Sequence, residues 1–368
     1  MINETILKNE EKAVFTLRSI YRKFGYLPYK MGKFEEYDFY VKNKDFLISD
    51  RVITFNDTNG KLMALKPDVT LSIIKNHKDE PGTVQRVYYN ENVYRISEST
   101  NAYKEIMQAG LECFGEIDIY NKLEVLNLAT ESLAAISDEF VLEISHMGIL
   151  SGLLNASNGD SEFKKLITAC VGEKNAHEIP RICAEFNVSG EVCNKLMEFV
   201  DIYGSRTDVL KRLEKLCEGD EMHSALQELR MISNAMESSP YSENILFDFS
   251  IVSNMKYYNG VLFRGFINGI PESVLSGGQY DNLMKKIGRG GGAIGFAVYL
   301  DLLENLKKRQ NTYDVDVVLV YSDDDSMEDI RRETEALNAA GLTVSVQRNI
   351  PESLNFRQVI RMSERSGK

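Results

Sequence analysis

The sequence predicts an α+β protein built on an antiparallel sheet, and three observations lead to this prediction. Two β-rich runs flank Asn59-Gly60, a dipeptide typical of a tight hairpin turn. Strand-like runs also occur at 86–115 and again at 245–269. Between them, residues 151–237 show almost only the 3.6-residue period of helices, which predicts a helical insertion.

The first half of the chain supplies the elements around this sheet. Residues 4–24 carry an apolar stripe typical of a helix, and Gly25 suits its C-terminal cap. Residues 33–41 are predicted to form a strand that enters the core. The amphipathic pattern of residues 119–137 predicts a helix, and residues 140–150 predict a strand and a turn into another helix.

Glycines are concentrated near the end of the predicted core, at 277–278, 288 and 290–292. They fit two tight strand connections that lead into a strand and then a helix at 296–308. They do not fit a phosphate-binding P-loop, because no Gly-Lys-Ser/Thr follows them. The sequence therefore predicts no cofactor.

The tail alternates strand and helix. A strand precedes a helix at 326–339 that Gly341 caps, and a second strand precedes the start of a helix at 356. Two strands are few for an independent α/β domain. We therefore predict a core over residues 1–312 and a partial α/β segment over residues 313–368.

Composition narrows the class of protein. Of 368 residues, 43% are hydrophobic and 27% charged, as in ordinary soluble proteins with a sizeable core. No apolar run reaches the roughly 18 residues of a membrane span, and the polar N-terminus does not resemble a signal peptide. We therefore expect a cytoplasmic protein that does not enter a membrane.

Charge and cysteine content exclude two further classes. The net charge of −12, from 43 basic and 55 acidic residues, lacks the basic footprint of a nucleic-acid binder and argues against tRNA binding. The five cysteines form no CxxC pair, and with four scattered histidines they make no zinc pattern. We expect buried, reduced thiols, although spacing alone leaves a Cys–His nucleophile open.

One predicted strand carries a polar face. Side chains at 106–114 alternate between the two faces of the strand. One face is apolar, and the other carries Gln108 and Glu112, which lie about 13 Å apart along the strand. Gly110 leaves room between them, and an antiparallel return brings Arg95 over the same face. A cation, an amide and a carboxylate together suit a small zwitterion. A solvated polar face on an edge hairpin fits the spacing equally well.

Two other stretches could complete such a site. Asp68 and Thr70 face the same way if their strand continues, and a carboxylate beside a hydroxyl can hold an ammonium group. The alternative is an N-cap and first-turn pair for the following helix. Tyr257 and Tyr258 could wall a pocket, although two tyrosines in a strand are also ordinary core or edge residues.

Together these stretches resemble the catalytic core of histidyl-tRNA synthetase, a class II aminoacyl-tRNA synthetase. The matching motifs are PDVT at 67–70, YRIS…KEIMQAGLECFG at 94–115, YYNGVLF at 257–263 and SGGQYDNL…AIGFA at 276–297. They occur in that family's order and cover nearly the whole chain. The resemblance implies a class II antiparallel sheet with flanking helices, followed by the start of an anticodon-binding domain.

The departures from that family concern ATP chemistry. The motif 3 arginine falls on Leu302, and an arginine before the two tyrosines falls on Ser253. In motif 2, an acidic residue falls on Ser97 and an arginine of the loop falls on Ala102. The motif 1 proline falls on Gly32. Arginines hold the ATP phosphates and stabilise charge as the adenylate forms, so the resemblance implies that ATP activation is lost.

The family's histidine-pocket positions are kept, at Asp68, Thr70, Arg95, Gln108, Glu112 and Tyr258, with Tyr257 beside them. By resemblance, the acid, hydroxyl and amide hold the ammonium group, Arg95 the carboxylate, and Glu112 with a tyrosine the imidazole. A kept pocket beside lost ATP chemistry resembles the ATP phosphoribosyltransferase regulatory subunits, a non-catalytic paralogue family.

This second resemblance implies a role in the first step of histidine biosynthesis. It implies a homodimer, a hetero-oligomer with the short-form ATP phosphoribosyltransferase catalytic subunit, and L-histidine as the candidate feedback effector. The alternatives are an active histidyl-tRNA synthetase and a synthetase-like amino-acid-binding protein with another partner.

Overall fold

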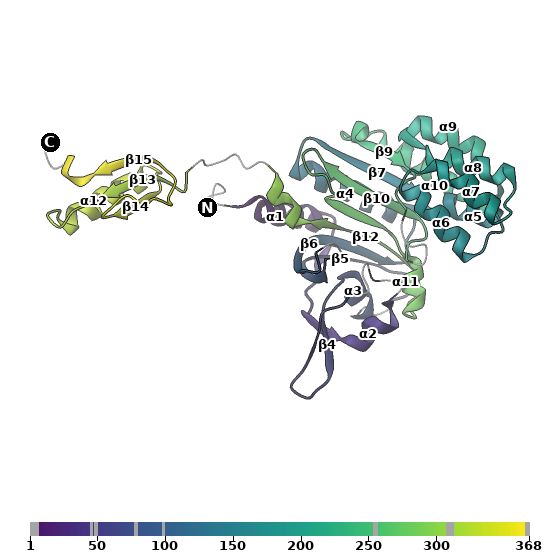
Figure 1. Ribbon diagram of the computed structural model, residues 1–368, viewed down its shortest axis with the longest axis horizontal. Helices are drawn as coiled ribbons and strands as arrows, with labels where there is room; N and C mark the ends of the chain where they lie inside the picture. The colour runs from purple at the N-terminus through teal and green to yellow at the C-terminus, as the bar shows by residue number, and fades with distance from the viewer. Residues whose placement is uncertain are drawn as a thin grey trace. The chain divides into compact units, whose positions relative to one another are not determined.

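The computed structural model describes residues 7–44, 47, 51–76, 80–97, 100–252, 257–306 and 313–364. The chain divides into two compact units, Met1–Leu306 and Lys307–Lys368, whose elements Figure 1 labels. No helix in the described part of the chain is long and apolar enough to cross a membrane.

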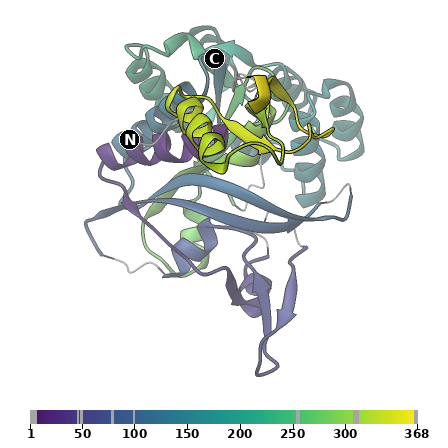
Figure 2. The same cartoon turned by 90° about the vertical axis from the view of Figure 1, so that its left-hand side faces the viewer.

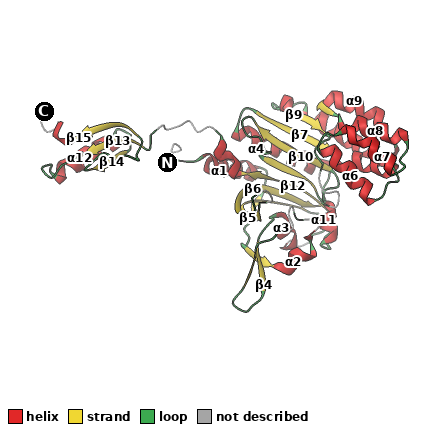
Figure 3. Cartoon of the chain, in the orientation of Figure 1, coloured by secondary structure: helices red, strands yellow, loops and turns green. Residues whose placement is uncertain are grey.

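The larger unit is built around a nine-stranded sheet of order β1-β5-β6-β12-β11-β10-β7-β9-β8. In that order the strands are Leu27–Pro28, Val84–Ile96, Tyr103–Gly115, Gly292–Tyr299, Leu275–Gln279, Val261–Ile267, Phe140–His146, Ile245–Asp248 and Tyr203–Ser205. Neighbouring strands are antiparallel except in the pairs β1–β5 and β7–β9. The predicted α+β fold on a largely antiparallel sheet is confirmed (Figure 3).

The longest strands of this sheet, β5 and β6, run side by side (Figure 2). As their alternating pattern predicts, Leu111 and Cys113 of β6 are fully buried in the main core. Gln108 and Glu112 lie on the opposite face, paired across the strands with Glu91 and Val87. The sheet therefore separates an apolar core from a second face that carries polar side chains.

Helices α1 (Asn9–Lys23) and α4 (Ile119–Ile136) cover the core face of the sheet. α4 begins with a reciprocal cap, in which the Asp118 carboxylate accepts from the Asn121 N–H at 3.0 Å and the Asn121 side chain accepts from the Asp118 N–H at 3.1 Å. The two helices meet at a buried hydroxyl pair, Tyr21 and Ser132, whose oxygens are 3.1 Å apart.

Residues 151–237 are helical apart from β8, which sequence patterns did not predict. The helices are α5 (Met147–Ala156), α6 (Ser161–Gly172), η3 (Ala176–Glu178), α7 (Ile179–Glu185), α8 (Gly190–Val200), α9 (Arg206–Leu216) and α10 (Gly219–Met236), and η4 (Ser242–Asn244) follows them. Their apolar faces join the main core, so this helical segment and the sheet share one hydrophobic cluster.

On the other face of the sheet, α3 (Thr70–Asn76) and α11 (Asp281–Lys286) form a second, smaller core with β5, β6 and β12. A three-stranded sheet of order β2-β4-β3 lies next to this core, with strands Phe34–Glu36, Leu62–Leu65 and Thr54–Asn56. The predicted hairpin turn at Asn59-Gly60 is present, and Gly60 has a φ of +80°.

Two predicted elements of the larger unit are wrong in part. The strand expected over 33–41 ends at Glu36 and continues as helix α2 (Tyr37–Lys42), because β4 offers partners to only three residues of β2. The helix expected over 296–308 is instead the end of β12, followed by the 3₁₀ helix η5 (Leu300–Asn305). Pairing of β12 with both β6 and β11 keeps these residues extended.

The smaller unit is a parallel sheet of order β14-β13-β15 with one α-helix. Its elements are β13 (Val315–Val320), α12 (Met327–Ala339), β14 (Val344–Gln347), β15 (Phe356–Arg361) and η6 (Met362–Glu364). The expected helix start at 356 is wrong, since β15 pairs with β13 along its length. β15 pairs with backbone N–H and C=O groups of β13 that would otherwise lack a partner on that edge of the sheet.

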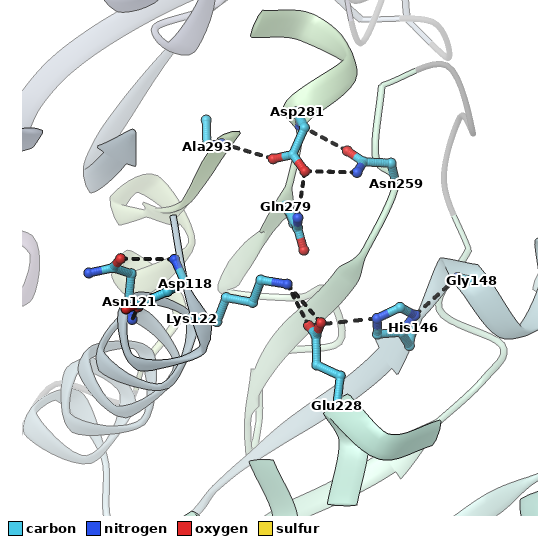
Figure 4. A network of polar contacts seen from close by, with 10 residues as sticks. All are labelled: Asp118, Asn121, Lys122, His146, Gly148, Glu228, Asn259, Gln279, Asp281 and Ala293. Carbon is cyan, nitrogen blue, oxygen red and sulfur yellow. Dashed lines mark hydrogen bonds and ion pairs between the residues drawn. The ribbon is translucent and has the colours of Figure 1, made fainter. Parts of the chain in front are cut away.

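A cluster of charges connects α10 to α4 and to the sheet (Figure 4). Lys122 Nζ lies 2.8 and 2.7 Å from the two carboxylate oxygens of Glu228. His146 Nε2 lies 3.7 Å from the same carboxylate, while its Nδ1 accepts from the Gly148 N–H at 3.0 Å. Glu228 thus receives two basic side chains from two other elements.

We expect Glu228→Gln to lower the melting temperature at pH 7 and to lower it by roughly half as much near pH 3. Burial raises the pKa of Glu228, but the hydrogen bonds and charges of His146 and Lys122 outweigh it and lower the pKa to about 2. An unfolded glutamate has a pKa of about 4.3, so the carboxylate stabilises the fold above that pH by at most ~3 kcal/mol. That stabilisation is lost as the pH falls toward 2.

Thermal melts of both proteins at pH 7 and pH 3 measure this effect. Glu191→Gln is the matched control, because Glu191 is an exposed carboxylate paired with Lys195 and should change the melting temperature little at either pH. An equal loss for Glu228→Gln at both pH values would contradict the prediction.

Candidate functional site

A pocket of about 100 Å³ opens between the polar face of the nine-stranded sheet and the second core. Its polar lining consists of Asp68, Thr70, Tyr89, Arg95, Gln108, Glu112, Tyr257, Tyr258, Ser276, Tyr280 and Tyr299, and the rest is Leu47, Val69, Gly277, Gly295, Phe296 and Ala297. All seven residues that the sequence singled out line this one cavity. The edge-hairpin alternative is therefore wrong.

Glu112 lies at the centre of the polar contacts and is only 2% exposed. Its carboxylate accepts from the Thr70 hydroxyl at 2.6 Å and from the Tyr280 hydroxyl. Burial raises the pKa of Glu112 to about 8, against the lowering effect of these two hydrogen bonds, and the charge of Asp68 adds to the rise. A carboxyl group with this pKa can change its charge near neutral pH when a ligand arrives.

Asp68 has two roles at once. Its carboxylate accepts from the Leu71 N–H at 2.8 Å at the start of α3, as the helix-cap alternative requires. The same side chain also lines the pocket. Burial raises the pKa of Asp68, while the Leu71 N–H and the charge of Arg95 lower it.

Arg95 reaches the pocket from β5 and fixes the segment that carries Asp68. Its Nε donates to the Pro67 carbonyl oxygen at 3.0 Å. The antiparallel return predicted for this strand pair therefore places the guanidinium in the same cavity as Gln108 and Glu112.

Aromatic rings form the walls of the pocket. The rings of Tyr257 and Tyr258 have centroids 4.4 Å apart, and those of Tyr257 and Tyr280 are 5.8 Å apart. The Tyr299 hydroxyl lies 2.7 Å from the Ser276 hydroxyl. Sequence reasoning missed Tyr280 and Tyr299, which also line the pocket.

Tyr89 was missed as well, and strand register is the signal that could have found Tyr89 and Tyr299. Tyr89 lies opposite Gly110, and Tyr299 lies opposite Gln108. A residue that pairs directly with a predicted site residue shares its face of the sheet.

Three glycines on neighbouring strands, Gly110, Gly278 and Gly295, form what we call the glycine floor on the pocket face of the sheet, and Gly295 itself lines the pocket. A Cβ atom at Gly110 would lie 2.2 Å from the Phe296 carbonyl oxygen, which confirms that this position must be empty. At Gly295 it would lie 1.8 Å from the Glu112 carboxylate, and at Gly278 2.8 Å from the Tyr258 ring. The absence of side chains on this glycine floor lets the pocket side chains Glu112, Tyr89 and Tyr258 pack directly against the main chain.

The arrangement suits an amino acid. Two acids, a hydroxyl and an amide can receive cationic or N–H groups, while the guanidinium can receive a carboxylate. Within the described ranges no group of three or more His, Cys, Asp or Glu side chains is placed to hold a metal ion. The five cysteines are buried and form no disulfide.

None of the described positions that depart from the synthetase pattern lines this pocket. Leu302 lies in η5 and packs against the main core. Ser253 lies outside the described residues, as does Lys256. Gly32, Ser97 and Ala102 are described but do not line the pocket.

Comparisons with known proteins agree with the motifs. A curated ATP phosphoribosyltransferase regulatory subunit from Oceanobacillus iheyensis is 28% identical over 286 residues, which are 77% of this chain and 70% of the relative. A solved structure described as an ATP phosphoribosyltransferase regulatory subunit/histidyl-tRNA synthetase from Bacillus halodurans has the same fold. Its TM-score is 0.78 at 24% identity, and the match covers 98% of this chain and 96% of that one.

A second solved structure, described as the ATP phosphoribosyl transferase (HisG:HisZ) complex from Thermotoga maritima, matches with a TM-score of 0.63 at 20% identity. The match covers 79% of this chain and 97% of that one. The resemblance to these regulatory subunits is therefore confirmed. Residues 3–303 also match the sequence profile of a family described as histidyl-tRNA synthetase, and the chain belongs to that family, with its class II fold.

Proposed function

We propose that the chain is a non-catalytic regulatory subunit of ATP phosphoribosyltransferase and that its pocket binds L-histidine. The observation that supports this proposal is a pocket in which two acids, an amide, a hydroxyl and a guanidinium meet, in a chain where, by resemblance, the motif 3 arginine falls on Leu302. The names of its relatives support the same conclusion. In this role the chain senses the end product of the pathway and transmits its level to an enzyme.

The pocket side chains divide the groups of histidine between them. Arg95 receives the carboxylate, and Asp68, Thr70 and Gln108 receive the ammonium group. Glu112, supported by a tyrosine hydroxyl, receives the imidazole. Each group of the ligand thereby meets a side chain of complementary charge or hydrogen-bonding type.

The partner in this proposal is the short-form catalytic subunit of ATP phosphoribosyltransferase, and the chain itself forms a homodimer within a hetero-oligomer. The similarity of the fold to a chain in a solved ATP phosphoribosyl transferase complex supports this assembly. Light scattering on the chain alone and on its mixture with the catalytic subunit measures both steps of assembly.

Calorimetric titration with histidine and with ATP is the direct test of the pocket. We expect histidine to bind and the chain to form no histidyl-adenylate when both ligands are present. We also expect ATP phosphoribosyltransferase activity to rise when the chain joins the catalytic subunit and to fall when histidine is added. Formation of histidyl-adenylate would refute the non-catalytic role.

The second candidate is an active histidyl-tRNA synthetase. The pocket residues favour it as much as they favour the regulatory subunit, because both would hold histidine in the same way. The two candidates differ in one product. Histidyl-adenylate, detected by exchange of labelled pyrophosphate into ATP, is expected only from the synthetase.

A further inference from the structure

The two wall tyrosines, Tyr257 and Tyr258, are followed directly by a residue that is locked to α11. Asn259 Nδ2 donates to Asp281 Oδ2 at 3.0 Å, and Asn259 Oδ1 accepts from the Asp281 N–H at 2.8 Å (Figure 4). Because both bonds join the same two residues, Asn259 can neither rotate nor shift along α11 without breaking one of them.

The Asp281 carboxylate collects donors from two more strands. Gln279 Nε2 at the end of β11 donates to its Oδ2 at 2.6 Å, and the Ala293 N–H of β12 donates to its Oδ1 at 2.9 Å. All three groups that face the carboxylate are N–H donors. A carboxylate satisfies all three donors because both of its oxygens accept hydrogen bonds. An amide at this position would place its own NH₂ group opposite one of these N–H donors.

The next residue, Gly260, fixes the chain from the opposite side. Its carbonyl oxygen accepts from the Met147 N–H at 2.9 Å. A Cβ atom here would lie 2.1 Å from Gln279 Oε1, so Gln279 packs directly on the glycine backbone. The segment after the tyrosines therefore has little freedom to move.

Both halves of this contact adjoin the pocket. Asn259 follows Tyr258, and Asp281 follows Tyr280, whose hydroxyl donates to Glu112. The bond between Asn259 and Asp281 thus joins the two stretches that supply the tyrosine wall and the hydrogen bond to the central acid.

We propose that Asn259, Gln279 and Asp281, which we call the bracket, are positioning residues that set how tightly the pocket holds its amino acid. The inference rests on the proposed function of the pocket as a histidine site. None of the three bracket residues lines the pocket itself. They act through Tyr258 and Tyr280, which do.

The test compares two asparagines on either side of β10. Asn259→Ala removes the bracket, whereas Asn268→Ala removes a similar bond from Asn268 Nδ2 to Glu139 Oε2, 2.6 Å long, outside the pocket. We expect Asn259→Ala to raise the histidine Kd at least about tenfold and Asn268→Ala to leave it unchanged. Melting temperatures of both variants, measured in parallel, separate positioning from a general loss of stability.

A swap of the two side chains tests the geometry. Asp281→Asn alone should weaken binding, and the double variant N259D/D281N should recover it. In the double variant the acid and the amide exchange places, and Gln279 can turn its Oε1, which has no hydrogen-bond partner among the described residues, toward the new amide. An unchanged Kd for Asn259→Ala, or a double variant as weak as Asp281→Asn, would overturn the proposal.

The bracket can also be tested if the chain does not bind histidine. If the wild-type chain binds no histidine, the proposed function of the pocket fails, and hydrogen exchange of residues 257–263 then tests the bracket without a ligand. Faster exchange there in Asn259→Ala than in Asn268→Ala supports the bracket, and equal exchange in both variants overturns it.

Discussion

Replacing Glu112 by alanine is expected to weaken histidine binding about 10- to 100-fold while the chain stays folded. The carboxylate receives the hydroxyls of Thr70 and Tyr280 and is the only acid we assign to the imidazole. Hydrogen bonds to a charged group contribute about 1.5–3 kcal/mol, and each 1.4 kcal/mol corresponds to about tenfold in Kd.

Calorimetry on the isolated chain and a histidine titration of the assembled enzyme measure the effect. Glu105→Ala is the matched control, because Glu105 lies on the same strand, is exposed and does not line the pocket. If Glu112→Ala responds to histidine as the wild type does, feedback acts at some other site.

The charge of Glu112 should also make binding release a proton. With a pKa of about 8, this carboxyl is mostly protonated at pH 7 in the empty pocket. An N–H of the neutral imidazole donates to the carboxylate form of Glu112 and lowers its pKa, so a proton leaves on binding. The affinity should therefore rise between pH 7 and about 8 and then level off, because above that pH the proton has already been lost.

Titrations at pH 7 in two buffers of different ionisation enthalpy count the released protons. Glu112→Gln has no proton to release and should show the same heat in both buffers. The same release from Glu112→Gln as from the wild type would place the proton on another group.

The second large effect expected is on stability, from Glu91→Gln. Lys66 is 0% exposed, and its Nζ lies 2.9 Å from Glu91 Oε2. Loss of the acid leaves a buried cation without its partner, which costs about 3–5 kcal/mol in comparable cases. Lys66 leads directly into Asp68 and Thr70, so the pocket should loosen as well.

Urea unfolding at pH 7 and pH 10 measures this loss. Burial lowers the pKa of Lys66, and Glu91 raises it. Without Glu91 the pKa falls further, so the unfolded chain binds more protons than the folded one and the loss should shrink as the pH rises. Lys66→Met combined with Glu91→Gln should recover most of the stability, because it removes both charges. A loss below about 0.5 kcal/mol for Glu91→Gln would contradict the prediction.

Gln108 and Glu112 could be predicted from the sequence because a local rule, alternation along one strand, places them together. The two-residue spacing of Asp68 and Thr70 predicted a shared face only if their strand continued, whereas α3 begins at Thr70 and both residues line the pocket from its start. Tyr89 and Tyr299 were not predicted, since their position in the pocket depends on which residues lie opposite them in strands distant in sequence. Local spacing carries no information about that register.

The same limit explains the elements that differ. Residues 37–42 and 356–361 have patterns compatible with either helix or strand, and the presence or absence of a neighbouring strand decides between the two. β15 is extended because β13 lies beside it, whereas β2 pairs with β4 over three residues only and the chain then continues as α2. Patterns within one segment cannot show whether such a partner exists.

The glycine floor limits how this site can change in evolution. A glycine has no side chain left to shorten, so any substitution in the glycine floor can only reduce the volume of the pocket. One added methyl group at Gly295 would collide with the Glu112 carboxylate, whereas no exchange at that position enlarges the cavity. A homologue that binds a bulkier ligand must therefore gain space by substitution of the tyrosines and acids that line the pocket.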